Sequence, residues 1–257
     1  MNNLLELKRQ IVGVKFYYDE AEYAASPARQ LKHKLPYCMT VRVATNGSAV
    51  KVRADNIGCF AAARVLGMTE VTESYKSGED YMAFNMFKNQ AASKKVCDNL
   101  TINPRTPYGV EISALALMET DPDIVIIVTV PYNIMRIIQG YNYHYGTYNR
   151  YKMGGLQAMC SEITATTYVT GEINTSMMCA GTRYLSKWDP SEMAVGIPWA
   201  KFENVVDGVY KTVDPLERDR AKKRIVAAFE SSGMTPPDVH MGKNYDSDYY
   251  EVGTTKI

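Results

Sequence analysis

The sequence predicts a mixed α/β protein of the α+β class, in which an internal duplication relates two α/β units by a pseudo-twofold axis. Segments typical of buried strands, such as 12–18 and 124–130, alternate with segments of helical periodicity. Each half of the chain also carries its own pair of cysteines, and the segments around these pairs recur in the same order. These observations together predict the fold class.

The two halves can be aligned segment by segment. The first half runs IVGVKF, Cys38, SAVKVRAD, Cys59 with FAAARVLG, GEDYMAFNMF and the helical KNQAASKKV. The second half runs DIVIIVTV, Cys160, GEINTSMM, Cys179 with AGTRYL, PSEMAVGIPW and the helical AKFENVVDGV. The first two cysteines have 20 residues between them and the last two have 18. We expect repeat unit one, about 10–105, and repeat unit two, about 123–213, to superpose, with the MAxxxF and MAxxxP segments as equivalent strands. Chance similarity of two α/β halves is the alternative.

Local patterns refine the repeat. The segment MTVRVATNGSAVKVRAD alone predicts a β-hairpin turning at Asn46-Gly47, whereas its partner GGLQAMCSEITAT predicts a helix. Because a duplicated unit should not be both, we expect a helix followed by a strand. Cys59 and Cys179 each follow capping residues and precede a helical pattern, so we expect both at helix N-termini, where free N–H groups and the helix dipole stabilise a thiolate.

The whole chain, 1–257, is predicted to form a single compact domain. A C-terminal helix is expected over 215–232, with Asp214 as its cap, Pro215 at its first position and Gly233 at its end. The sequence after this helix shows neither helical nor strand periodicity, and we expect an irregular tail over 234–257.

Composition excludes several partners. Lys plus Arg (29) nearly cancels Asp plus Glu (28), which predicts neither a nucleic-acid nor a membrane partner. The first ten residues do not resemble a secretory signal, and five cysteines in such a chain predict free thiols in the cytoplasm. Without a GxGxxG, Walker or HExxH motif, no nucleotide cofactor is expected.

Several motifs carry a resemblance to a known family. They are LPYC-MTV, C-F-A-A-A, PDIVIIV, MRIIQGYNYHYG, GGLQAMC, the CAGTR stretch and SEMAVGIPW, in this order over about 13–213. In these residues the chain resembles domain-of-unknown-function family 169, which is found largely in anaerobic bacteria and archaea. The family usually has C-x-G-G where this sequence has C-F-A-A. The resemblance implies the fold and the cysteine positions, and it brings no established activity.

Cysteine chemistry gives the sharpest candidate site. If the two units face each other across the pseudo-twofold axis, then Cys38, Cys59, Cys160 and Cys179 form a four-thiol ligand set for an iron–sulfur cluster or zinc. The absence of CxxC spacing makes this signal weak, and burial of the thiols as small apolar side chains is the alternative. The fifth cysteine, Cys97, lies mid-helix and has no counterpart in the other half.

A second candidate is a thiol enzyme. Cys179 would be the nucleophile, Arg183 one turn later would stabilise its thiolate, and His144 would be the base. Gln139 and Tyr143 accompany His144 in a tyrosine-rich segment that would either wall a ligand pocket or form a surface between copies of the chain. The alternative for His144 is a surface histidine without a catalytic role. For both Arg183 and Arg64, the default interpretation is a charged side chain that faces solvent on a helix.

The sequence therefore predicts a cytoplasmic, cysteine-dependent metal or iron–sulfur protein, either an enzyme or an accessory factor of anaerobic metabolism, that acts on a small molecule. A thiol enzyme and a non-catalytic ligand-binding or assembly module remain as alternatives.

Overall fold

The protein folds around a seven-stranded sheet with strand order β2-β3-β4-β1-β5-β7-β6. The computed structural model describes residues 1–245. Neighbouring strands are antiparallel except for the parallel pair β2–β3. The strands are β1 (Val12–Tyr17), β2 (Arg29–Gln30), β3 (Ala49–Val52), β4 (Gly109–Ala114), β5 (Ile124–Thr129), β6 (Asn174–Ser176) and β7 (Met193–Pro198).

Two compact units make up the chain. The first, here called the sheet unit, comprises 9–134 and 148–201 and holds every strand of the sheet; the second, the terminal unit, comprises 1–8, 135–147 and the chain from Phe202 onward. The helices within the sheet unit are α2 (Glu20–Ala25), α3 (Tyr37–Thr45), η1 (Ala54–Asn56), α4 (Phe60–Val65), α5 (Glu73–Lys76), η2 (Glu79–Phe84), α6 (Gln90–Asn99), η3 (Leu115–Leu117), η4 (Ala158–Ala165), α8 (Thr166–Thr170) and α9 (Ala180–Ser186).

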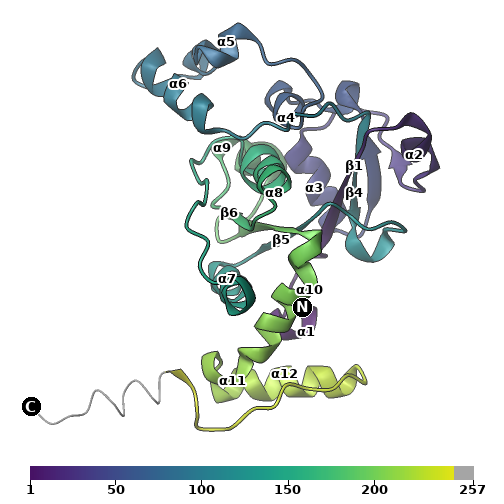
Figure 1. Ribbon diagram of the computed structural model, residues 1–257, viewed down its shortest axis with the longest axis vertical. Coiled ribbons are helices and arrows are strands. Elements are labelled where there is room, and N and C mark those ends of the chain that lie inside the picture. Colours follow the sequence, from purple (N-terminus) through teal and green to yellow (C-terminus); the bar gives the residue numbers. More distant parts are fainter. Residues whose placement is uncertain (246–257) are drawn as a thin grey trace, which may run out of the picture. The chain divides into compact units, whose positions relative to one another are not determined.

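Side chains on β1 show how helices cover the two faces of this sheet. Successive strand residues point to opposite faces. Phe16 contacts Tyr168 of α8, with ring centroids 4.5 Å apart, whereas Tyr17 contacts Tyr23 of α2 at 5.9 Å. Helices α3 and α8 therefore lie on one face and α2 on the other (Figure 1). Within residues 1–245, no helix is long and apolar enough to cross a membrane.

The order of helix and strand around the first cysteine pair is confirmed. The segment that alone predicts a hairpin forms helix α3 and then strand β3, as the comparison of the two halves predicts. The prediction that the MAxxxF segment is a strand is wrong. Its first three residues, 82–84, complete the 3₁₀-helix η2 (Glu79–Phe84), and the C-cap residue Asn85 has φ 52°. One neighbour of β1 is β5, and the strand that pairs with β1 on the opposite edge is β4. Strand β4 lies beyond the expected end of repeat unit one at about 105.

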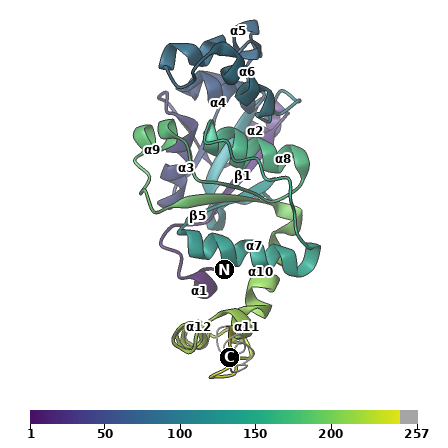
Figure 2. The same cartoon turned by 90° about the vertical axis from the view of Figure 1, so that its left-hand side faces the viewer.

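The terminal unit contains helix α1 (Asn2–Leu5) and the pair α11 (Val213–Leu216) and α12 (Asp219–Ser231), while α7 (Pro131–Tyr145) and α10 (Trp199–Lys211) begin in the sheet unit and continue into it. Figure 2 shows α11 beside α12. The prediction of a single helix over 215–232 is wrong, because extended backbone at Glu217 separates α11 from α12. Its carboxylate pairs with the buried Arg136 guanidinium at 2.7 Å, which favours the break.

Asp214 is therefore not a helix cap. It lies inside α11, and its carboxylate accepts hydrogen bonds from Lys222 Nζ at 2.8 Å and from the backbone N–H of His240 at 2.6 Å. Gly233 does follow the end of α12, with φ +67°, as expected. The first part of the predicted irregular tail is held by such bonds, including one from the Gly242 N–H to Asp219 at 2.9 Å. The rest of that prediction, 246–257, lies outside the described residues.

Helix η4 packs directly on the backbone of β7. A Cβ atom on Gly196 of β7 would lie 2.5 Å from the Ile163 carbonyl oxygen and 2.5 Å from Thr167 Oγ1. Real Cβ atoms do not approach other atoms this closely. The helix can therefore approach the sheet only because Gly196 has no side chain. The position of η4, and of every residue it carries, depends on this contact.

We expect Gly196→Ala to lower the free energy of unfolding by about 1–3 kcal/mol, because the added methyl group must push η4 away from the sheet. Gly154→Ala is the matched control, since its Cβ would meet only Glu162 Oε1 at 3.9 Å. Urea unfolding of the two variants and wild type measures the difference. Equal stability of the two variants would contradict the close packing.

Candidate functional site

Four cysteines from distant parts of the sequence line a single pocket of about 650 Å³ in the sheet unit. Cys38 is the second residue of α3, and Cys160 lies in the first turn of η4. Cys59 and Cys179 are the residues that immediately precede α4 and α9, which confirms the predicted helix starts. The fold thus brings the beginnings of four helices, two from each half of the chain, to one cavity.

The remainder of the pocket is almost entirely apolar. Its lining contains no Asp, Glu, Lys, Arg or His side chain, and Gln157 and Thr182 are among its few polar residues. Phe60, Phe84 and Tyr184 also line it and are 51%, 58% and 84% exposed, so aromatic side chains stand at its opening. A cavity of this size and character is typical of a small-molecule or cofactor site.

Two of the sulfur atoms accept hydrogen bonds from α9. Cys38 Sγ accepts from the Ser186 hydroxyl at 3.0 Å, and Cys179 Sγ accepts from the Thr182 backbone N–H at 3.3 Å. Burial raises the pKa of the Cys38 thiol, while the Ser186 and Thr182 hydroxyls oppose this rise. Thr182 and Ser186 stand three and seven residues after Cys179, on the same face of the helix. The α9 helix therefore supplies donors to one sulfur from each half of the chain.

Cys160 has a different environment. It lies in η4, a π-helix that begins after Gln157, whose φ is 50°. The thiol is 8% exposed and donates to the Gln157 carbonyl oxygen, with the sulfur and oxygen 3.6 Å apart. Burial, followed by the neighbouring cysteines, raises the pKa of Cys160 well above its usual value. Short π-helical segments are frequent at functional sites, and this one places the most buried sulfur of the pocket.

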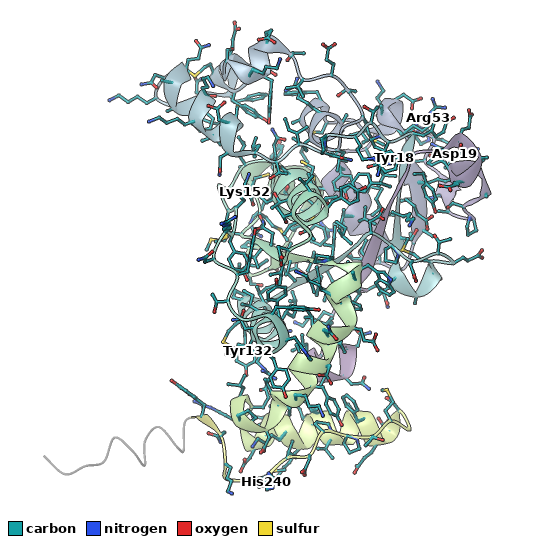
Figure 3. All side chains as sticks on the ribbon, in the orientation of Figure 1. Tyr18, Asp19, Arg53, Tyr132, Lys152 and His240 are labelled. Atoms are coloured by element: carbon teal, nitrogen blue, oxygen red, sulfur yellow. The ribbon has the colours of Figure 1, made fainter. Side chains whose placement is uncertain are left out.

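The loop before η4 is fixed by a buried carboxylate. Glu162 accepts hydrogen bonds from the backbone N–H groups of Gly154 and Gly155 at 2.7 and 2.8 Å, and burial raises its pKa. The backbone N–H of Lys152, labelled in Figure 3, donates to Asn174 Oδ1 at 2.8 Å. These bonds tie the loop to η4 and β6, so the Cys160 region is held from both sides.

The four cysteines do not form the coordination shell of a single ion. In residues 1–245 no three Cys, His, Asp or Glu side chains are arranged to hold one metal ion together. The four cysteines line one cavity without forming such a group.

The arginines have other partners. The Arg183 guanidinium donates to the backbone carbonyl oxygens of Met177 and Glu192, both at 2.8 Å, and is not part of the pocket lining. The interpretation of Arg64 as a solvated charge is wrong, because it is 6% exposed and pairs with Asp80 at 2.9 Å. Residues that follow α4 fold back over it, which the local helix pattern could not indicate.

Gln139, Tyr143 and His144 lie in the part of the tyrosine-rich segment that belongs to the terminal unit. His144 Nε2 lies 2.8 Å from the Asp207 carboxylate, Tyr143 is 55% exposed, and Gln139 is half-buried. None of the three is among the residues that line the cysteine pocket. Their proposed roles as base and ligand-binding residues stay predictions.

Sequence reasoning missed several residues of the pocket. Tyr81 and Phe84 line it from η2, the segment that was expected to be a strand. Gln157 was also missed, although it lies three residues before Cys160 in a motif that the sequence singles out. Helical spacing after Cys179 would have indicated Thr182. Cys97 is buried within α6 and is not part of the lining.

A second cavity of about 590 Å³ is lined by Tyr18 and Arg53, both labelled in Figure 3, together with Asp55 and Tyr108. The Arg53 guanidinium stacks on the Tyr108 ring at 4.6 Å. This cavity contains no cysteine in its lining, so the thiol chemistry belongs to the first pocket.

Brief alkylation of the native, metal-free protein should modify Cys38, Cys59 and Cys179, which are partly exposed, and spare Cys160 and Cys97, which are buried. Peptide mapping by mass spectrometry identifies the modified thiols. The same reagent in urea is the control and should modify all five. Rapid native labelling of Cys160 would contradict the described burial.

Comparisons with known proteins place the chain in a family. An uncharacterised protein (MJ0308) of Methanocaldococcus jannaschii is 23% identical over 208 residues, which cover 80% of this chain and 89% of the relative. No solved structure matches the chain. The sequence profile of DUF169, described as "Uncharacterised ArCR", matches residues 1–208. The chain therefore belongs to the DUF169 family, as its motifs indicate.

Proposed function

We propose that this protein is a cytoplasmic, cysteine-dependent iron–sulfur or metal protein, an enzyme or accessory factor of anaerobic metabolism, that holds its metal centre in the four-cysteine pocket. The single observation that carries the proposal is the convergence of Cys38, Cys59, Cys160 and Cys179 on one cavity from four separate helices. Thiolates are the ligands of iron–sulfur clusters and of structural zinc. All five cysteines are free thiols, which suits a reducing compartment.

The arrangement favours a cluster over a single zinc ion. Zinc needs its thiolates within about 2.3 Å of one centre. A four-iron cluster spreads its ligands, because each of its four cysteines binds a different iron atom. The sulfurs surround the cavity without forming a single-ion shell, and α9 already donates hydrogen bonds to two of them. Donors to cysteine sulfur stabilise the thiolate form that such a centre requires and tune its reduction potential.

We also infer that the pocket arose by duplication. In the sheet, β1 and β5 form the central antiparallel pair, with β4 and β7 next to them and β3 and β6 outside these. When the two-residue strand β2 is left out, each half has its third strand between its first and second, and a cysteine-bearing helix start precedes and follows its second strand. With β4 as the counterpart of β7, two equivalent cysteine pairs face one cavity. This supports a site built at the pseudo-twofold axis.

A thiol enzyme is the second candidate, and one observation favours it. Cys179 Sγ accepts the Thr182 N–H and lies 3.1 Å from the Thr182 hydroxyl, on the partly exposed side of an apolar pocket. Such donors support a nucleophilic thiolate acting on a small organic molecule. Arg183 is engaged with carbonyl oxygens, so the thiolate would depend on these donors.

Colour and iron content distinguish the candidates. We expect anaerobically purified or reconstituted protein to be brown, with charge-transfer absorption and stoichiometric iron and sulfide. Colourless protein with one hyper-reactive cysteine would support the thiol enzyme. Colourless protein without a reactive thiol would support a non-catalytic binding module.

Cys179→Ser should remove most of the bound iron, because it deletes a pocket sulfur, whereas Cys97→Ser should leave iron content near that of wild type. The pair is matched, since both change one thiol to a hydroxyl in the sheet unit. Iron and sulfide analysis after identical reconstitution measures the effect, and circular dichroism checks the fold. Equal iron content in the two variants would contradict a metal centre in this pocket.

A further inference from the structure

We propose that the four-cysteine pocket binds a small, uncharged aromatic molecule that donates one hydrogen bond to Gln157 Oε1. The inference deepens the proposed function and rests on it in one respect, since it names the class of small molecule that this pocket admits. Three features carry it: an unpaired oxygen on Gln157, the fixed position of that residue, and an aromatic, uncharged lining.

Gln157 carries a buried polar atom that the fold leaves without a partner. The residue lines the pocket and is 6% exposed, and within residues 1–245 its Oε1 atom has no hydrogen-bond partner. The other end of the amide is occupied, because Nε2 donates to the Tyr81 hydroxyl. Burial raises the pKa of both Tyr75 and Tyr81, and the Gln157 amide opposes the rise, as a donated N–H group would. The carbonyl end of the amide is therefore the end left for a ligand.

The other buried hydroxyls of the lining are already paired. The Tyr37 hydroxyl forms a hydrogen bond with Thr164 at 2.9 Å, and the Thr182 hydroxyl lies 3.1 Å from Cys179 Sγ. A buried acceptor without a partner costs free energy, which a donor on a ligand would recover. The lining therefore matches a molecule with a single hydrogen-bond donor, and Gln157 Oε1 is its acceptor.

The position of Gln157 is fixed before any ligand binds. Its backbone has φ 50°, a left-handed conformation that is unfavourable for residues other than glycine and is concentrated at functional sites. Its carbonyl oxygen accepts from the backbone N–H groups of Ser161 at 2.8 Å and Glu162 at 3.2 Å. With Tyr81 holding the side chain, the amide is anchored at both ends. Little conformational freedom remains to be lost when a ligand binds.

The rest of the lining favours a flat, uncharged ligand. No charged side chain of the described residues lines the pocket, so an ionic ligand would lose its hydration without gaining a partner. Tyr81 contacts Phe84 with ring centroids 6.3 Å apart, and Phe84 is 58% exposed. Aromatic surface thus continues from the Gln157 amide to the opening. The volume of about 650 Å³ has room for a fused ring system that stacks on these rings.

Indole and indene form a matched pair of probes, because they have nearly the same shape and only indole carries an N–H donor. Equilibrium dialysis of each probe against anaerobically purified wild-type protein measures its affinity. We expect indole to bind about 10-fold more tightly than indene, the ratio that one hydrogen bond of about 1.4 kcal/mol produces. Equal affinities, or no binding of indole, would overturn the inference, and this comparison does not depend on the folding of any variant.

Gln157→Leu then identifies the acceptor. Leucine is similar in size and accepts no hydrogen bond, so the folded variant, as judged by circular dichroism, should bind the two probes with equal affinity. Gln10→Leu is the matched control, because Gln10 is exposed and lies outside the lining, and it should keep the preference of wild type. A Gln157→Leu protein that keeps this preference would contradict the assigned hydrogen bond.

The outcome is separable from that for the metal centre. Protein that binds no iron but prefers indole would support the inference and overturn the metal centre. Protein that contains iron and binds both probes equally would overturn the inference alone.

Discussion

The pocket depends on the contact between η4 and the backbone of β7 at Gly196, where only the absence of a side chain allows the helix to approach. Helix η4 in turn contacts α3 and α4, and α3 contacts α9, so each cysteine-bearing element is positioned by its neighbour. Because interiors are close-packed, a shift of η4 would be transmitted through these contacts to every sulfur. The chemistry of the site is thus coupled to the packing of one helix on one strand.

Electrostatics at the site comes from hydrogen bonds and burial, without charged side chains. The Ser186 hydroxyl and the Thr182 N–H act on sulfurs from different halves of the chain, and burial acts most strongly on Cys160. Arg64 and Arg183, which could have supplied positive charge, are committed to Asp80 and to backbone carbonyls. A metal centre here would be surrounded by apolar groups and directed dipoles, which are the means by which proteins tune clusters.

The two halves of the chain place their cysteines in different local structures. The strand order about β1 and β5 is equivalent in the two halves, yet the helix that carries Cys38 is an α-helix and the segment that carries Cys160 begins as a π-helix. This difference turns one thiol toward a hydroxyl donor and the other toward a carbonyl acceptor. Cys38 and Cys160 therefore have different hydrogen-bond partners, although both line the same pocket.

The sequence by itself determined the features that depend on neighbours along the chain. These are the helix starts after Cys59 and Cys179, the buried strand 124–129 and the helix end at Gly233, all set by periodicity and capping within a few residues, whereas the helix and strand around Cys38 followed only from comparing the two halves. The tertiary structure decided what distant contacts control. Pairing with β1 made β4 the sheet strand and left the MAxxxF segment as η2, and the Arg136–Glu217 pair accompanies the break in the C-terminal helix. The convergence of the cysteines likewise required four helices to pack together, and the similar spacing of the two cysteine pairs could only suggest it. The physical reason is that long-range packing energy outweighs the local preferences that a sequence displays.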